Sequence, residues 1–182
     1  MGKRDRSMST LPPLPQPNPE NQKRNRRSRA KGMAFEALLD KTFAYYAEKG
    51  FAKIEKNAEP VRIIRNMGQG KFLACFTKKA QADYKGTIKG GRTVIFEAKY
   101  TEQDRLLQNA VDENESEYME IHDGLGARCY VICGFPSGNV YRVPWGVWKN
   151  MKRIYGHKYV TEEEIKQYQV QKSWNDRLLI LE

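Results

Sequence analysis

Hydrophobic and polar residues alternate from Thr93 to Tyr100, which is the pattern of a β-strand. The even-numbered residues of this stretch form an apolar face, while Glu97 and Lys99 point to the opposite side. Lys89-Gly90-Gly91 before it is typical of a tight turn, because glycine adopts positive φ at little cost. Counting outward from this turn places Asp83 directly opposite Glu97. The pattern therefore predicts a β-hairpin that carries two opposed carboxylates and a lysine on one face.

The patterns on either side of this hairpin predict an α/β chain. Before it we expect an amphipathic helix over residues 32–50, a strand over 51–56, and a second hairpin with arms 61–64 and 71–76. After it we expect a polar loop over 101–111, a helix over 113–125, a buried strand over 127–135, a strand over 140–143, a helix over 144–155, a short helix from 161 and an edge strand over 178–181.

Charge is concentrated at the start of the chain. The 182 residues carry a formal net charge of +10, and residues 1–31 hold nine lysines and arginines against two acids, a net of +7. We expect residues 1–30 to be a disordered, basic, proline-rich arm and residues 31–182 to be one folded domain. A basic arm favours a polyanionic partner, with nucleic acid ahead of a membrane. The arm is either a solvated tail or a phosphate-binding segment that uses Arg24, Arg26, Arg27 and Arg29.

Cysteine use and hydropathy indicate the compartment. The chain has three cysteines and two histidines, which fits buried thiols in a reducing compartment and argues against a zinc site. No apolar run is long enough to span a membrane, and the N-terminal stretch has no signal-peptide core. We therefore expect a cytoplasmic protein.

Two opposed carboxylates repel each other unless a cation lies between them. Asp83 and Glu97 offer the hard oxygen ligands that Mg²⁺ or Mn²⁺ prefers, and the Ala98 carbonyl between the strand's two charged residues is a further candidate ligand. Lys99 could orient a nucleophile or counter the charge of a phosphoryl transition state. The alternative is an ordinary surface ion pair within an exposed hairpin. Taken together, the residues favour a metal-dependent nuclease site.

Other charged residues are candidates for the edge of the site and for DNA contact. Glu36 lies at the border of the apolar stripe of the first helix, where an acid is more often a solvated flank residue than part of a site. The second hairpin is equally compatible with DNA-backbone binding and with an ordinary charged hairpin. The remaining candidate DNA-binding residues are Arg62, Arg65, Lys71, Lys78, Lys79 and Lys85.

Asp83-Tyr84-Lys85-Gly86 followed by Phe96-Glu97-Ala98-Lys99 resembles the active-site hairpin of RecU-type Holliday junction resolvases, within the PD-(D/E)xK nuclease superfamily. The resemblance covers about residues 31–135. It implies a restriction-endonuclease-like α/β core with a mixed central β-sheet flanked by helices, Mg²⁺-dependent paired nicking of four-way DNA junctions, and a homodimer. It also implies that Asp83 and Glu97 hold metal, that Lys99 serves catalysis, and that Glu36 borders the site.

The family has a projecting segment that enters the junction, and residues 57–82 correspond to it here. The chain departs from the family pattern in three ways. The projecting segment is short, a serine- and threonine-rich lead-in to the aspartate is replaced by residues 78–82, and the glutamine and histidine pattern of the following helix appears as Glu115 and Tyr118.

Our interpretation is a homodimeric, metal-dependent endonuclease that resolves branched DNA in recombination and repair. One alternative is a nuclease that acts on flap or linear duplex DNA. Another is a non-catalytic DNA-binding protein, which would bind DNA in a salt-sensitive way without nicking it.

Overall fold

The computed structural model describes residues 18–58, 61–76, 81–173 and 177–181. Its centre is a mixed five-stranded sheet with the order β1-β4-β5-β7-β8, in which only the β5–β7 pair is parallel. The helices are α1 (Pro19–Glu48), α2 (Glu113–Gly124), α3 (Trp145–Lys149) and α4 (Met151–Tyr155). The strands of the main sheet are β1 (Ala52–Lys56), β4 (Tyr84–Ile88), β5 (Thr93–Tyr100), β7 (Arg128–Gly134) and β8 (Val140–Pro144). This is the predicted architecture of a mixed central sheet flanked by helices.

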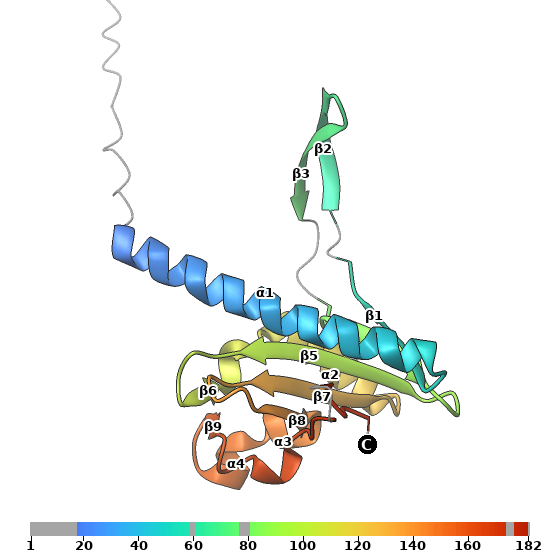
Figure 1. Ribbon diagram of the computed structural model, residues 1–182, viewed down its shortest axis with the longest axis vertical. Helices are drawn as coiled ribbons and strands as arrows, with labels where there is room; N and C mark the ends of the chain where they lie inside the picture. Colours follow the sequence, from blue (N-terminus) through green and yellow to red (C-terminus); the bar gives the residue numbers. More distant parts are fainter. Residues whose placement is uncertain (1–17, 59–60, 77–80, 174–176, 182) are drawn as a thin grey trace, which may run out of the picture.

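The sheet separates two hydrophobic cores. One core lies between the sheet and α1, and the other lies between the sheet and the helices α2, α3 and α4 (Figure 1). Strand β5 supplies both cores, because Val94 and Phe96 point toward α1 while Ile95 points toward α2. The predicted alternation of β5 is therefore confirmed, and the face that carries Glu97 is the α2 face.

The register of the β4–β5 hairpin is the one predicted from its turn. Tyr84 pairs with Phe96 and Thr87 pairs with Thr93, so one further step outward sets Asp83 opposite Glu97. Gly86, in the middle of β4, permits the neighbouring strand β1 to approach closely. A Cβ atom at this position would lie 2.1 Å from the carbonyl oxygen of Lys53, so only glycine fits this register.

Helix α1 begins earlier than the sequence predicts. It spans 30 residues from Pro19, with the side chain of Asn18 accepting the N–H of Glu20 at 2.9 Å and proline in the first turn. Residues 19–30, which we expected in a disordered arm, are thus helical, because a cap and a run of good helix formers extend the helix N-terminally. Residues 1–17 of the predicted arm lie outside the described residues.

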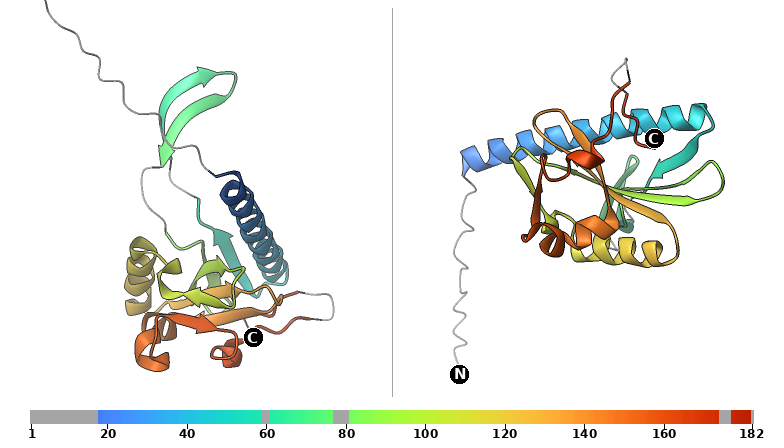
Figure 2. Two further views of the ribbon diagram at one scale, coloured as in Figure 1. Left: turned by 90° about the vertical axis from the view of Figure 1, so that its left-hand side faces the viewer. Right: turned by 90° about the horizontal axis from the view of Figure 1, so that it is seen from below.

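The predicted second hairpin consists of β2 (Val61–Gly68) and β3 (Lys71–Phe76), and we call it the projecting hairpin. It stands away from the main sheet (Figures 1 and 2). Large apolar side chains remain exposed on both of its strands, namely Val61, Ile63, Ile64, Met67, Phe72 and Leu73. At its base, Asn57 donates its backbone N–H to the Asp83 carbonyl at 2.8 Å and its side-chain amide to the Ala82 carbonyl at 2.6 Å. The base of the hairpin is therefore fixed beside Asp83.

Several later elements differ from the prediction. The expected polar loop over 101–111 contains β6 (Arg105–Leu107), which pairs with β9 (Tyr159–Thr161), and a 3-10 turn at Gln108–Ala110. The helix expected over 144–155 is divided into α3 and α4. The helix expected from 161 is turns and a 3-10 segment, Lys166–Tyr168. The edge strand expected over 178–181 is not formed. Instead, these residues pack in the core beside α1, and Leu178 makes an isolated β-bridge with Lys172. Among the described residues, none of the helices combines the length and apolar character needed to cross a membrane.

Candidate active site

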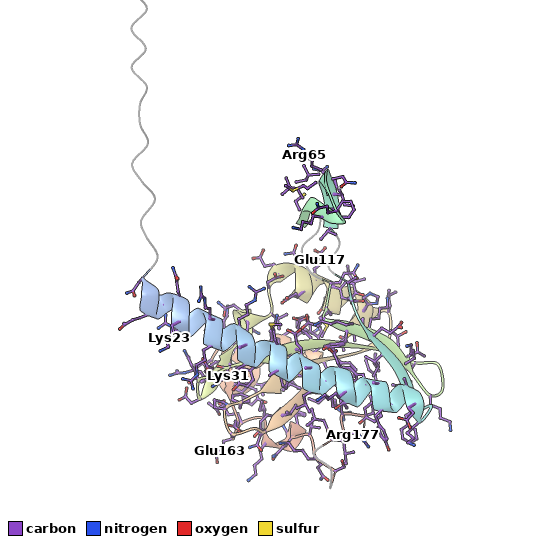
Figure 3. The ribbon with its side chains drawn as sticks, turned by 45° about the horizontal axis from the view of Figure 1, so that its top comes forward. Lys23, Lys31, Arg65, Glu117, Glu163 and Arg177 are labelled. Carbon is purple, nitrogen blue, oxygen red and sulfur yellow. The ribbon has the colours of Figure 1, made fainter. Side chains whose placement is uncertain are left out.

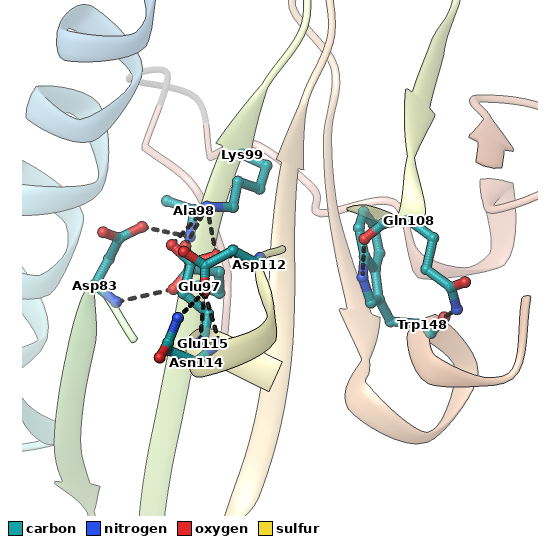
Figure 4. Close-up of polar contacts among 9 residues, drawn as sticks. All are labelled: Asp83, Glu97, Ala98, Lys99, Gln108, Asp112, Asn114, Glu115 and Trp148. Atoms are coloured by element: carbon teal, nitrogen blue, oxygen red, sulfur yellow. Dashed lines mark hydrogen bonds and ion pairs between the residues drawn. The ribbon is translucent and has the colours of Figure 1, made fainter. Parts of the chain in front are cut away.

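Asp83 and Glu97 are held together by reciprocal hydrogen bonds (Figure 4). The backbone N–H of Asp83 donates to Glu97 Oε2 at 3.1 Å, and the backbone N–H of Ala98 donates to Asp83 Oδ2 at 2.9 Å. Each carboxylate therefore accepts a hydrogen bond from the strand that carries the other. These bonds fix the two side chains in the arrangement that the hairpin register predicted.

Lys99 lies on the same face of β5 as Glu97 and contacts two acids. Its Nζ lies 2.6 Å from Glu97 Oε1 and 3.0 Å from Glu115 Oε2. The ammonium group also donates to Glu115 Oε1 at 3.1 Å. Lys99 is therefore held between an acid on its own strand and an acid on α2, and it cannot swing away without breaking both contacts.

Glu115 is a site residue whose role the sequence reasoning missed. It sits in the first turn of α2, where Asp112 Oδ1 accepts its N–H at 3.0 Å and its own Oε2 accepts the N–H of Asp112 at 2.8 Å. This reciprocal capping box orients the Glu115 side chain toward Lys99. The signal was present in the sequence as an aspartate followed three residues later by a glutamate at the start of a predicted helix.

Burial sets the electrostatics of the site. Glu97 is completely buried, and burial together with the negative charge of Asp83 raises the pKa of Glu97 to about 9, despite the opposing effect of Lys99. Burial also raises the pKa of Asp83, although the Ala98 N–H offsets part of the increase. Burial alone would lower the pKa of Lys99, but Glu97 and Glu115 outweigh it and hold this pKa above its usual value. The site thus contains more negative charge than its lysine balances.

The donor set fits a divalent metal ion. Glu97 Oε1 is buried and accepts no well-aligned hydrogen bond from the described residues, although the Lys99 ammonium is near it. No cluster of three or more acidic, histidine or cysteine side chains that could hold a metal occurs in the described part of the chain. Two carboxylates are a usual protein contribution to a Mg²⁺ site, since Mg²⁺ keeps several waters and takes the remaining ligands from phosphate. The residues that could hold such an ion are Asp83 and Glu97, with the Ala98 carbonyl as a third ligand.

Glu36 lies at the rim of this arrangement. Its carboxylate pairs with Lys56, and its backbone carbonyl accepts the Tyr84 hydroxyl at 3.3 Å. Its negative charge contributes to the raised pKa of Asp83, but within the described residues it makes no ion pair or hydrogen bond with Asp83, Glu97 or Lys99. The structure therefore places Glu36 near the site and outside its hydrogen-bond network.

The candidate DNA-binding residues fall into three groups. Those on α1 are all exposed, namely Arg24, Arg26, Arg27 and Arg29. Arg27 forms an ion pair with Glu102 at 3.7 Å, and Lys31 forms one with the same carboxylate at 2.5 Å. Those on the projecting hairpin are Arg62, Arg65 and Lys71, also exposed, with Arg65 labelled in Figure 3. Lys85 is exposed on β4, and Lys78 and Lys79 lie outside the described residues.

A mixed sheet that brings Asp83, Glu97 and Lys99 together is the arrangement expected of restriction-endonuclease-like nucleases with a PD-(D/E)xK site. Comparison with protein families narrows this class. The model of the RecU family, described as recombination protein U, matches residues 30–181. The chain belongs to the RecU family.

Two relatives of known family agree with this assignment. A Holliday junction resolvase RecU of Bacillus pumilus is 33% identical over 147 residues, which cover 74% of this chain and 69% of the relative. One of Streptococcus sanguinis is 28% identical over 113 residues, which cover 59% of this chain and 56% of the relative. Among solved structures, the Holliday junction resolvase Hjc of Archaeoglobus fulgidus matches with a TM-score of 0.45 and 17% identity, covering 75% of this chain and 88% of that chain.

Proposed function

We propose that the chain is a metal-dependent endonuclease that resolves four-way DNA junctions by paired nicks, in DNA recombination and repair. The observation that supports the chemistry is the reciprocally hydrogen-bonded pair Asp83 and Glu97 with Lys99 at 2.6 Å from Glu97. Membership in the RecU family and the names of its relatives support the substrate.

The reaction adds water to a phosphodiester, forms a new P–O bond and breaks the bond to the leaving sugar oxygen. A bound Mg²⁺ or Mn²⁺ would supply Lewis-acid polarisation of the phosphate and a lowered pKa of the attacking water. Asp83 and Glu97 would hold that ion. Lys99 places a positive charge beside them, where it can orient the nucleophile and counter the charge that builds on the phosphoryl oxygens.

Glu115 acts in this proposal as a positioning residue. A cation held by Asp83 and Glu97 would weaken the attraction between Glu97 and Lys99. The two contacts from Lys99 Nζ to Glu115, at 3.0 and 3.1 Å, then keep the lysine in place. The capping box holds Glu115 itself, so the orientation of Lys99 is set by the start of α2.

A homodimer would present two identical sites to a junction of approximate two-fold symmetry, which accounts for cutting of both strands. The projecting hairpin and the basic residues of α1 would contribute contacts to the DNA backbone. Because the sugar-phosphate backbone is the same in all duplexes, these contacts position the substrate without selecting a sequence.

A panel of DNA substrates tests the proposal and its alternatives. Matched four-way, flap and linear duplexes are incubated with wild type and with Asp83→Asn in Mg²⁺, Mn²⁺ or EDTA. The proposal predicts metal-dependent paired nicks in the four-way substrate alone, at a rate about 100-fold or more lower with the variant. Preferential cutting of flap or linear DNA would support the first alternative. Tight, salt-sensitive binding without nicking in either metal would support a DNA-binding protein.

A further inference from the structure

A basic cleft lies beside the active site on the α2 face of the sheet. It has a volume of about 520 Å³ and lies between the β4–β5 turn and the C-terminal end of α2. Its lining residues are Lys85, Gly90, Gly91, Arg92, Thr93, His122, Leu125, Gly126 and Ala127. None of these described lining residues is acidic, so the cleft combines positive charge with backbone and hydroxyl groups that can hydrogen-bond an anion.

Two of the elements that line the cleft, β4 and α2, also position residues of the candidate active site. Lys85 follows Asp83 by two residues on the same face of β4, a separation of about 7 Å at the usual rise of a strand. His122 follows Glu115 by seven residues on α2, which places it on the same helix face about 10 Å further along. These separations correspond to roughly two to three nucleotides, given one phosphate per 3.4 Å of axis on each strand.

The cationic side chains of the cleft are not engaged in ion pairs among the described residues, and Glu55, which lies across the β1–β4 ladder from Lys85, pairs with Lys53 at 3.1 Å. Within the part of the chain that the structure describes, neither Lys85 nor Arg92 makes an ion pair. Burial and the positive charge of Lys85 both lower the pKa of His122. His122 is further placed by contact of its ring with the Tyr118 ring, with centroids 4.5 Å apart. Lys85 on the strand and His122 on the helix therefore influence each other across the cleft.

We propose that this cleft binds the phosphates of the DNA strand on one side of the scissile bond, with Lys85 and Arg92 as charged contacts and His122 as a hydrogen-bonding contact. This inference rests on the proposed function, since it takes the scissile phosphate to lie at Asp83 and Glu97. It assigns a direction to the bound strand, which runs from the catalytic carboxylates along β4 toward the hairpin turn. The ordinary alternative is a set of solvated surface side chains that contribute nothing specific.

Binding measurements test the cleft without requiring cleavage. The double variant Lys85→Gln/Arg92→Gln is compared with wild type for binding to a four-way junction in EDTA, across a range of salt concentrations. The matched control is Lys152→Gln/Arg153→Gln, which removes the same charge from exposed positions of α4. Loss of two phosphate contacts lowers the salt slope by about 1.8, so the ratio of affinities at 50 and 200 mM salt shrinks about 12-fold. A cleft variant that matches wild type or the control in this slope would overturn the proposal.

Chemically modified substrates then locate the contact. Single methylphosphonates, which remove the charge of one phosphate, are placed at successive positions on both sides of the cleavage point. We expect one to three positions on one side to slow the wild type, and the same positions to cause no further loss in Lys85→Gln. Equal slowing of both proteins at every position would contradict the assigned contact. If the wild type cuts no junction, the proposed function fails, and the salt slopes in EDTA still decide whether the cleft binds DNA.

Discussion

Substituting Glu97 by glutamine should stabilise the metal-free protein while abolishing its activity. Glu97 is completely buried, and its pKa is raised to about 9 from an ordinary value of 4.5 by burial and by Asp83. The folded state binds the proton of the Glu97 carboxyl more tightly than the unfolded state does. The stability that this proton contributes is therefore fully present below about pH 4.5 and is lost as the pH rises toward 9. Glutamine keeps the oxygen that accepts the Asp83 N–H and removes the titration.

The magnitude follows from the pKa difference. At pH 7 the carboxyl of an unfolded chain is 2.5 units above its ordinary pKa of 4.5, and at about 1.4 kcal/mol per unit the buried carboxyl costs roughly 3–4 kcal/mol. For a chain of this size that corresponds to a rise in Tm of up to roughly 10 °C for Glu97→Gln in EDTA. Near pH 5 the difference between the two proteins should shrink to about 1 kcal/mol, because the unfolded-state carboxyl is then only half a unit above its ordinary pKa of 4.5.

Thermal unfolding in EDTA and in Mg²⁺ at pH 5 and pH 7 is the assay. Mg²⁺ at about 100 times its Kd should stabilise the wild type by about 2.7 kcal/mol and should leave the variant unchanged. Glu163→Gln, an exposed substitution far from the site in sequence, is the control and should show neither effect. If Glu97→Gln is no more stable than wild type in EDTA at pH 7, or if its advantage is as large at pH 5 as at pH 7, the electrostatic reasoning is wrong.

Three further perturbations test separate parts of the structure. Glu115→Gln preserves the capping box but weakens the hold on Lys99, so the rate of junction cleavage should fall roughly 10- to 100-fold with unchanged DNA affinity; a parallel loss of affinity would contradict a positioning role. Gly86→Ala places a Cβ 2.1 Å from the Lys53 carbonyl oxygen and should lower the free energy of unfolding, measured with a denaturant, by about 1–3 kcal/mol or more. The control Gly32→Ala, in open space on α1, should raise it by roughly 1 kcal/mol. Equal effects of the two substitutions would refute the packing argument. Replacing the projecting hairpin, residues 61–76, with a flexible linker should abolish junction cleavage. The Tm and its response to Mg²⁺ should stay nearly unchanged, because the hairpin exposes its side chains. Unfolding of the rest of the protein in this variant would show a structural role for the hairpin instead.

The active-site hairpin was predictable because its determinants are local. The turn at Gly90 and Gly91 fixes the register, and a period of two then decides which residues share a face. Asp83, Glu97 and Lys99 were found together for this reason. The second hairpin was predicted in the same way from its own strand pattern and glycine-containing turn, and the family resemblance added the expectation that this segment projects.

The parts that were missed depend on tertiary contacts. Glu115 enters the site because α2 packs against β5 and β7, which the capping-box spacing alone does not reveal. The segment over 101–111 looks polar, yet Leu106 and Val111 are buried against elements far away in the sequence. The first turns of α1 have no apolar stripe to mark them, and Lys31 contacts Glu102, which lies beyond the end of β5. In each case, the position of the segment is determined by contacts with residues distant in the sequence, which the local pattern of polar and apolar residues does not reveal.

The central claim is that Asp83 and Glu97 support metal-dependent cutting of a DNA junction. The most direct test is the yield of paired nicks in a synthetic four-way junction in Mg²⁺, measured for wild type and for Asp83→Asn, which retains an oxygen able to accept the Ala98 N–H. The wild type should cut both opposing strands, and the variant should be slower by about 100-fold or more, since it lacks one of the two metal-binding carboxylates. Undiminished cleavage by Asp83→Asn would contradict the assigned site.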